Sequence, residues 1–189
     1  MGQRRLAKAI HVGEEEIEIQ NTSRLGGGDQ GVVFRGSFRG RVVAVKMSGD
    51  PNTSRKEIDA MQKCSSPYLL PLVAVAEGSN VMLALEFMDG GDLRQYLDKK
   101  SRGELVEVEY STLVVAWIIA NAHADMHHEG FVQRDLTIEN VFISSMHYIK
   151  VGDLGITKEC VTNMTAYVGP LSWTHPKCPF PIPSRPTSP

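Results

Sequence analysis

The sequence predicts an α+β fold in two lobes, the first rich in strands and the second rich in helices. Strand-like runs of β-branched residues fill most of residues 17–87, and one segment among them has helical spacing. Gly90 and Gly91 then break the pattern, and a long segment with helical spacing follows at residues 106–128. We therefore expect a strand-rich lobe with one helix, a glycine hinge, and a helix-rich lobe.

The first lobe is expected to comprise residues 17–87. Its expected elements are strands at residues 32–38, 41–47, 69–76 and 81–87 and a helix at residues 54–64. Gly36–Gly40 and residues 77–80 supply turn-forming residues between neighbouring strands. Residues 1–16 mix basic and acidic side chains and end in glutamates, so we expect a solvated lead-in there.

The second lobe is expected to comprise residues 88–175. Asp92 is placed to cap a short helix, the long helix occupies residues 106–128, and two short strands lie at residues 141–143 and 148–151. Six of the fourteen residues from 176 to 189 are proline, which cannot continue a helix or a central strand. We expect this proline-rich segment to be a disordered tail.

Composition and charge bear on the class of function. Apolar residues make up 42% of the chain and charged residues 22%, and the net charge of −2 gives no electrostatic reason to expect nucleic acid as a partner. No apolar run is long enough to span a membrane. The cysteines are far apart and lack the spacing of a zinc site or a disulfide framework. We therefore expect a cytoplasmic protein in a reducing compartment.

A glycine-rich loop is the first candidate binding element. Gly26, Gly28 and Gly31 fit the pattern GxGxxG, with Gly27 between them, and glycines let backbone N–H groups approach phosphates closely. The same pattern occurs in dinucleotide-binding folds, but there a helix follows the loop, whereas here a strand is expected. The alternative is a tight hairpin turn with no ligand.

Lys46 ends an apolar strand, where it either extends its ammonium to water or binds phosphate oxygens across a cleft from the glycines. Glu57 follows on the expected helix. It fits an ion pair with Lys46 or, as the alternative, a capping box with Ser54 that starts the helix. The glycine loop in the same sequence favours the phosphate-binding interpretation for Lys46.

A second group of polar residues lies in the helix-rich lobe. Asp135 and Asn140 are expected in one loop between helix and strand, and Asp153 follows a later short strand. A carboxylate in such a loop can accept a proton from an attacking hydroxyl, and carboxylate and amide oxygens suit Mg²⁺. Any one of these residues could be an ordinary turn residue, but the set favours phosphoryl-transfer chemistry.

Together these motifs resemble the signature of eukaryotic protein kinases in order and spacing, from about residue 21 to about residue 176. The segment before Lys46 resembles the tyrosine-kinase-like group. The resemblance implies a bilobal protein-kinase-like fold, ATP and Mg²⁺ as cofactors, and a protein as substrate. Most members of that group phosphorylate serine or threonine, so we expect a Ser/Thr kinase, with tyrosine as the alternative acceptor.

The resemblance also implies a role for each matching residue. Asp135 is implied to be the catalytic base, Lys46 and Glu57 the catalytic ion pair, and Asn140 and Asp153 the Mg²⁺ ligands. The glycines Gly26, Gly27, Gly28 and Gly31 are implied to cover the ATP phosphates. The remaining residues implied to contact the nucleotide are Val33 and Ala44 at the adenine, Leu85 as gatekeeper, Glu86 and Met88 in the hinge, Asp92 at the ribose, and Phe142 beneath the base.

The sequence departs from the family pattern at several positions. Gln133 replaces the histidine of the catalytic loop and Leu154 the phenylalanine after Asp153. Neither Thr137 nor Glu139 supplies the cation that kinases carry near the γ-phosphate. The tail stands where the family has further helices, so we expect a C-terminally truncated member with uncovered apolar surface on residues 106–128. The alternative function is an inactive pseudokinase or fragment that acts as an ATP-binding or protein-interaction module.

Overall fold

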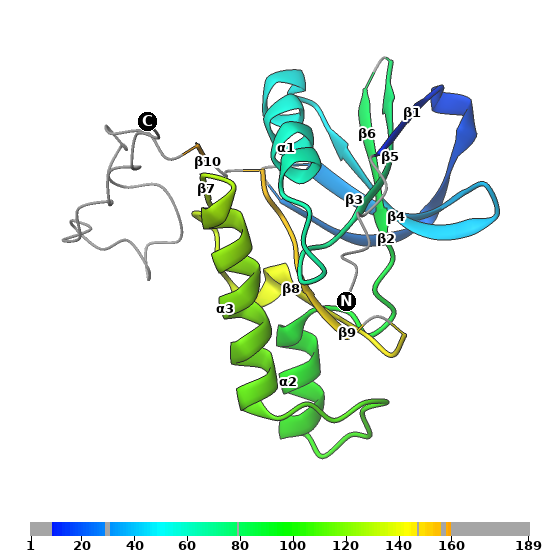
Figure 1. Ribbon diagram of the computed structural model, residues 1–189. Coiled ribbons are helices and arrows are strands. Elements are labelled where there is room, and N and C mark those ends of the chain that lie inside the picture. The colour runs from blue at the N-terminus through cyan, green and yellow to red at the C-terminus, as the bar shows by residue number, and fades with distance from the viewer. Residues whose placement is uncertain (1–8, 29–30, 79, 147, 156–157, 160–189) are drawn as a thin grey trace, which may run out of the picture.

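The computed structural model describes residues 9–28, 31–78, 80–146, 148–155 and 158–159. The described residues form the two expected parts, a strand-rich lobe with one α-helix and a lobe built on two α-helices (Figure 1). Six strands form the sheet of the first lobe in the order β1-β5-β6-β4-β3-β2. They are β1 (Ile10–Val12), β2 (Ile17–Gly28), β3 (Gly31–Phe38), β4 (Arg41–Ser48), β5 (Leu72–Glu77) and β6 (Val81–Glu86).

The centre of this sheet is an antiparallel arrangement of apolar strands. β4 pairs with β3 on one side and with β6 on the other, and Val43 and Val45 on β4 are fully buried. The turn between β3 and β4 uses Arg39 and Gly40, both with positive φ. The strands predicted at residues 32–38, 41–47 and 81–87 are therefore present, with ends shifted by one residue where they differ.

Residues 10–16 of the expected lead-in are exposed or half-buried, and they also contain regular structure. Ile10–Val12 forms β1, which pairs in parallel with β5, Ile10 lying opposite Ala74. A short 3-10 helix, η1 (Glu14–Glu16), then leads into β2. Because β1 is only three residues long and its partner lies far along the chain, no local pattern marks it.

The helix α1 (Pro51–Lys63) begins three residues before the predicted start at Ser54. Its N-cap is Asp50, whose carboxylate accepts hydrogen bonds from the backbone N–H groups of Asn52 and Thr53. Pro51 suits the first turn because its missing N–H would have no partner inside the helix. The capping box considered as the alternative for Ser54 and Glu57 is therefore absent, because Glu57 lies in the middle of the helix.

The second lobe follows Gly90 and Gly91 and contains α2 (Leu93–Ser101) and α3 (Thr112–His128). Its shorter elements are β7 (Phe131–Val132), η2 (Ile138–Asn140), β8 (Val141–Ser144), β9 (Tyr148–Val151) and β10 (Lys158–Glu159). The prediction of a helix from residue 106 is wrong for residues 106–111, because α3 begins after its N-cap Ser111. These residues instead pack beside α2, where the Tyr110 N–H donates to the Tyr96 hydroxyl.

The two lobes are joined by hydrogen bonds as well as by the chain. The segment before β5 pairs with β9, since the Leu70 N–H donates to the Val151 carbonyl and the Val151 N–H donates to the Tyr68 carbonyl. On the other side, the Gly90 N–H donates to the carbonyl of Ile143 in β8. The hairpin of β8 and β9 therefore lies between the sheet and the helices (Figure 1).

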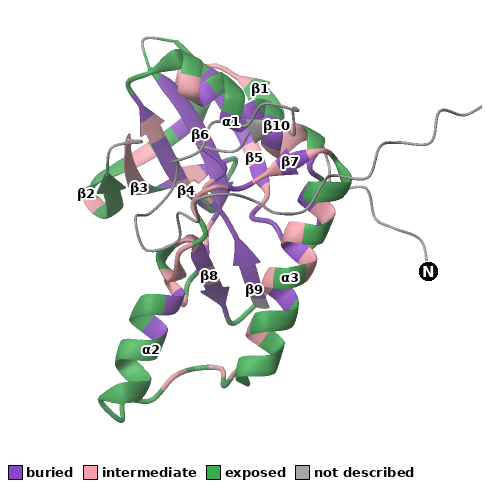
Figure 2. Ribbon diagram, turned by 90° about the vertical axis from the view of Figure 1, so that its left-hand side faces the viewer, coloured by how far each residue is buried: buried purple, intermediate pink, exposed green. Residues whose placement is uncertain are grey.

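Burial is uneven between the two lobes. Figure 2 shows strands such as β6 and β8 buried, whereas β2 and much of α2 and α3 are exposed. Within α3, Ile118, Ala122 and Met126 are buried, whereas Leu113, Val114 and Trp117 are exposed. Apolar surface on this helix is thus uncovered, as the sequence predicted.

No described helix is both long and apolar enough to cross a membrane. The predicted tail at residues 176–189 and the end of the expected second lobe, from residue 160 to residue 175, lie outside the described residues.

Candidate active site

The glycine-rich segment forms the end of the β2–β3 hairpin. Gly26 lies opposite Val33, and Gly28 lies opposite Gly31. Gly31 has φ of +127°, and a Cβ added there would lie 2.1 Å from the Met47 carbonyl oxygen, so this position requires glycine. A Cβ at Gly26 or Gly28 would meet nothing within 4 Å. The motif therefore lies in a hairpin, and the space beside Gly26 and Gly28 is open.

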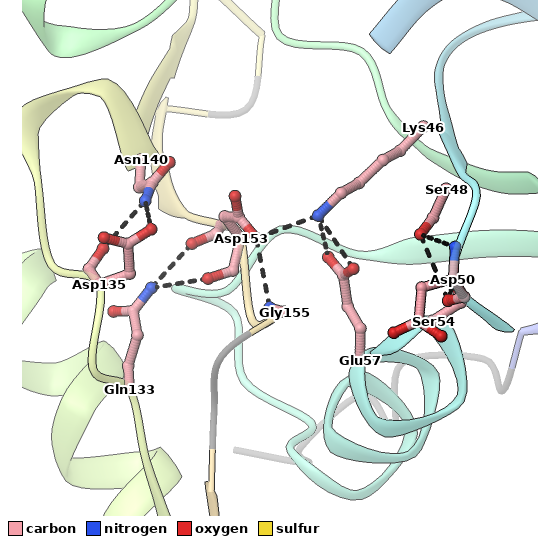
Figure 3. Close-up of polar contacts among 11 residues, drawn as sticks. Lys46, Ser48, Asp50, Ser54, Glu57, Gln133, Asp135, Asn140, Asp153 and Gly155 are labelled. Carbon is pink, nitrogen blue, oxygen red and sulfur yellow. Dashed lines mark hydrogen bonds and ion pairs between the residues drawn. The ribbon is translucent and has the colours of Figure 1, made fainter. Parts of the chain in front are cut away.

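Lys46 connects three elements that are far apart in the sequence (Figure 3). Its Nζ lies 2.9 Å from both Oε1 and Oε2 of Glu57 on α1 and 3.1 Å from Oδ1 of Asp153 after β9. Lys46 is 5% exposed and Glu57 is 2% exposed. The predicted ion pair between Lys46 and Glu57 is therefore present, and it lies out of water.

Burial and the charge of the ion-pair partner shift the pKa of each of these two residues in opposite directions. Burial lowers the pKa of Lys46, but the carboxylates of Glu57 and Asp153 outweigh it and raise the pKa overall. Burial also raises the pKa of Glu57, while the Lys46 ammonium acts in the opposite direction. We assign the pair as ionised because two carboxylates lie within 3.1 Å of the one ammonium. Lys46 is thus a fixed, buried positive charge between α1 and the turn after β9.

Asp135 and Asn140 are held together in the loop between β7 and β8. The Asn140 side-chain amide donates to the Asp135 backbone carbonyl at 2.9 Å and to its Oδ2 at 3.2 Å. The Asn140 backbone carbonyl accepts from the Gly152 N–H at 2.9 Å, which ties this loop to the turn carrying Asp153. Because the Asn140 nitrogen faces Asp135, its side-chain oxygen points away from that carboxylate (Figure 3).

Asp135 is a carboxyl group in a partly buried position near another acid. Burial raises its pKa above the ordinary value, and the charge of Asp153 raises it further. The hydrogen bond from Asn140 and the charge of Lys46 act in the opposite direction. A higher pKa makes a carboxylate a stronger proton acceptor, which is the property that a general base requires.

The turn that carries Asp153 has an uncommon backbone conformation. Asp153 has φ of +53°, in the left-handed region that residues with a Cβ rarely adopt. Its Oδ1 accepts from the Gly155 N–H at 3.2 Å, and the next residue, Leu154, is 2% exposed. Leu154 packs in an apolar cluster with Leu69, Met126 and Phe131, so the leucine fills an apolar site as expected.

The residues expected around an adenine ring lie between the two lobes. Leu85 and Met88 belong to one apolar cluster, against which Ala44 and Phe142 pack. Val33 lies opposite Lys46 in the sheet, and Asp92 pairs with Phe142 through an isolated bridge. Asp92 also caps α2, as predicted, because its Oδ1 accepts from the Gln95 N–H at 2.8 Å.

Glu86 is a predicted nucleotide contact whose side chain is both buried and engaged elsewhere. It is 5% exposed, its Oε1 accepts from the Arg41 guanidinium at 2.9 Å, and its Oε2 lies 3.8 Å from Nζ of Lys150. Lys150 on β9 also donates to the Pro67 carbonyl at 3.0 Å. A contact between Glu86 and a nucleotide would therefore use its backbone.

Two polar contacts in or beside this site could not be foreseen from the sequence. Nε of Arg94 on α2 lies 3.0 Å from Oε1 of Glu139, which brings a guanidinium to the loop of Asp135 and Asn140. Gln133 donates to two backbone carbonyls in the turn that carries Asp153. Both contacts depend on the tertiary arrangement, and neither pair has a characteristic spacing.

A glycine hairpin, a buried lysine paired with a helical glutamate, and two loop aspartates facing one space define a site of the phosphotransferase class. Residues 19–180 match the family described as "Protein tyrosine and serine/threonine kinase". The match covers most of the sequence, and the chain belongs to this protein kinase family.

The chain resembles kinases of both acceptor classes. It is 28% identical over 171 residues to the tyrosine-protein kinase ZAP-70 of Mus musculus, an alignment that covers 82% of this chain and 27% of that protein. It is 33% identical over 156 residues to the serine/threonine-protein kinase VIK of Arabidopsis thaliana, covering 76% of this chain and 35% of that protein. A probable serine/threonine-protein kinase of Dictyostelium discoideum is 29% identical over 181 residues, covering 89% of this chain and 11% of that protein. The chain thus spans about a third or less of the curated relatives that it matches.

Proposed function

We propose that this chain is an ATP- and Mg²⁺-dependent protein kinase that phosphorylates serine or threonine, with tyrosine as the alternative acceptor. The observation that carries the proposal is the position of Lys46, whose ammonium contacts Glu57 and Asp153 at once. This contact brings together the sheet, α1 and the turn after β9. In kinases such an arrangement positions the groups that bind phosphate and metal.

The residues fit the cofactor that the family uses. Asp135 and Asp153 are close enough for the charge of one to raise the pKa of the other, so a cation between them would relieve their repulsion. The side-chain oxygen of Asn140 points away from Asp135 and is placed to add an amide ligand. Mg²⁺ commonly binds through one or two carboxylates together with substrate phosphates. We assign Asn140 and Asp153 as the ligands, and the bound ion would neutralise phosphate charge.

The chain's own residues would then divide the work of transfer. The backbone of Gly26 to Gly28 lies over the phosphates, and the Lys46 ammonium binds their oxygens. Asp135 orients the acceptor hydroxyl and takes its proton while the hydroxyl oxygen bonds to the γ-phosphorus and the bond to ADP breaks. Leu85, Met88, Ala44, Val33 and Phe142 supply an apolar pocket for the adenine.

The acceptor class rests on the resemblance to the tyrosine-kinase-like group. Relatives of both classes match the chain to a similar degree, so they do not separate serine or threonine from tyrosine. An assay with acceptor peptides that differ only in carrying Ser, Thr or Tyr decides this point. Phosphorylation of the Tyr peptide alone would overturn the Ser/Thr assignment.

A second candidate is a pseudokinase that binds nucleotide without transfer. It is favoured by the loop between Asp135 and Asn140, where Thr137 and Glu139 supply no cation. The guanidinium of Arg94, which reaches this loop from α2, is paired with Glu139. If that pair persists with nucleotide bound, less positive charge is available to stabilise the transition state.

Two measurements separate these candidates. A thermal-shift titration with Mg-ATP should raise the melting temperature in both cases, and transfer of radiolabelled phosphate to a mixed peptide library should occur only with an active kinase. Asp135→Asn should abolish transfer and leave the thermal shift, whereas Asp98→Asn, at an exposed position on α2, should change neither. A folded sample without any Mg-ATP shift would contradict both candidates.

A further inference from the structure

Gln133 links the loop of Asp135 to the turn of Asp153. Its Nε2 donates to the Gly152 carbonyl oxygen at 2.9 Å and to the Asp153 carbonyl oxygen at 3.1 Å (Figure 3). Gln133 is 7% exposed, so both bonds are made out of water. One side chain thus holds two successive carbonyls of the same turn.

The orientation of the amide follows from its partners. Both are backbone carbonyl oxygens, which only accept, so the NH₂ group must face them, with one hydrogen for each. The opposite atom, Oε1, is buried and has no hydrogen-bond partner among the described residues. An unsatisfied buried acceptor destabilises a fold. The side chain therefore makes its two bonds to the turn although its own oxygen is left unpaired.

The turn needs such a restraint. Asp153 has φ of +53°, a conformation that is unfavourable for a residue with a Cβ. Gly152 before it is packed so closely that a Cβ would lie 2.8 Å from the Phe142 ring. Release of the carbonyls would let Asp153 relax toward a common conformation and move its carboxylate away from Lys46.

We propose that Gln133 is a positioning residue that acts as a two-donor clamp on this turn, holding the Asp153 carboxylate in place. The effect on Mg²⁺ binding rests on the proposed function, whereas the effect on the turn itself does not. An amide does not titrate, so its two N–H donors are present at every pH at which the chain is folded.

An imidazole in the same place would behave differently. Neutral histidine has a single N–H and can donate to one carbonyl only, and it gains its second N–H only on protonation near pH 6.5. The substitution Gln133→His should therefore make the clamp pH-dependent. Gln133→Met keeps the length of the side chain and removes both donors.

The test compares wild type with Gln133→Met, Gln133→His and the control Gln20→Met, which changes an exposed glutamine on β2. Hydrogen exchange at the Gly152 and Gly155 amides measures the turn directly, since both are hydrogen-bonded in the clamped state. Calorimetry measures ATP affinity with Mg²⁺ and with EDTA. A pH series from about 5.5 to about 8 brackets the ordinary pKa of histidine.

The expected result for Gln133→Met is exchange about tenfold faster at Gly152 and Gly155, since loss of hydrogen bonds worth about 1 kcal/mol each changes an equilibrium by that order. The gain in ATP affinity on adding Mg²⁺ should fall by about tenfold, with affinity in EDTA changed less than about twofold. Gln133→His should recover slow exchange most fully at low pH, and wild type should show no such titration.

Other outcomes would overturn the clamp or the function separately. Unchanged exchange at both amides in Gln133→Met, matching Gln20→Met, would overturn the clamp. Equal losses of ATP affinity with and without Mg²⁺, together with a lower melting temperature, would show a merely structural role and also overturn it. A wild type that binds no Mg-ATP, with exchange still accelerated by Gln133→Met, would refute the proposed function and support the clamp.

Discussion

The ammonium nitrogen of Lys46 lies 2.9 Å from both carboxylate oxygens of Glu57, and both side chains are buried. This ion pair fixes α1 against the central strand β4. The cost of removing the two charges from water is offset by their mutual attraction. Loss of one partner therefore leaves the other as an uncompensated buried charge.

Lys46→Met should therefore lower the free energy of unfolding by about 3–5 kcal/mol, because Glu57 remains buried without its counter-ion. The double variant Lys46→Met, Glu57→Leu should regain much of that stability, and neither should bind Mg-ATP as wild type does. Urea unfolding measures the free energy of unfolding of the single and the double variant. The control is Lys63→Met, which breaks the exposed pair with Asp59 on the same helix and should cost about 0.5 kcal/mol or less. Equal stability of wild type and Lys46→Met would show that the pair does not hold α1.

Asp135 should titrate above the ordinary pKa of an aspartate, 3.8, since burial and the charge of Asp153 favour its protonated form. Carboxyl NMR on selectively labelled protein checks this. Asp50, whose pKa is lowered by hydrogen bonds from Thr53 and Asn52, gives an internal reference that moves in the opposite direction. Asp153→Asn should lower the pKa of Asp135. A titration of Asp135 below that of Asp50 would contradict the assignment.

The same shift has a consequence for stability. A carboxyl whose pKa is raised on folding binds its proton more tightly in the folded state, so it destabilises the fold as pH rises through the window between 3.8 and the folded pKa. At neutral pH, Asp135→Asn should therefore be at least as stable as wild type and inactive as a kinase. Activity of the wild type should fall as pH decreases through the same window. A clear loss of stability in Asp135→Asn at neutral pH would count against this assignment.

Gly31 and Gly28 should differ sharply when each is replaced by alanine. Gly31→Ala forces a Cβ against the Met47 carbonyl at positive φ and should cost about 2 kcal/mol or more. Gly28→Ala meets no neighbouring atom and should change stability by about 0.5 kcal/mol or less. It should still weaken Mg-ATP binding, because its methyl would occupy space assigned to the phosphates. Thermal unfolding and calorimetry separate the two effects, and equal destabilisation by both would refute the hairpin geometry.

Leu113 and Ile118 on α3 should respond in opposite ways to a charge. Leu113 is 81% exposed, so Leu113→Glu should change stability by about 0.5 kcal/mol or less and should reduce aggregation by breaking an apolar surface. Ile118 is 6% exposed, so Ile118→Glu buries an unpaired charge and should unfold the chain. Light scattering and dye-binding fluorescence report the first effect, and circular dichroism reports the second. Unchanged aggregation of Leu113→Glu would show that this surface is covered in solution.

The sequence predicted the main elements because apolar periodicity follows burial directly. It failed where two local signals competed. The expected helix begins at Ser54, which is itself a suitable cap, yet Asp50 caps α1 and the helix begins at Pro51. Residues 106–111 carry apolar side chains that suggested a helix, but they are held beside α2 by the bond from Tyr110 to Tyr96.

The candidate site could be found from the sequence because its backbone requirements restrict residue type. Gly31 has no alternative to glycine, and the spacing of Asp135 and Asn140 follows from one short loop. Contacts that depend on three-dimensional proximity alone could not be found this way. The pairing of Arg94 with Glu139 and the two bonds of Gln133 are of this kind.

The buried contact of Glu86 with Arg41 and Lys150 has a mechanical consequence. It joins β4 and β6 of the first lobe to β9, so we expect the lobes to rotate about this contact. Displacement grows with distance from the axis of a rotation. The residues predicted to contact the adenine should therefore move least and the glycine hairpin most. NMR relaxation should then show larger amplitudes of backbone motion at Gly26 and Gly28 than at Glu86. In Lys150→Met the difference between these amplitudes should be smaller.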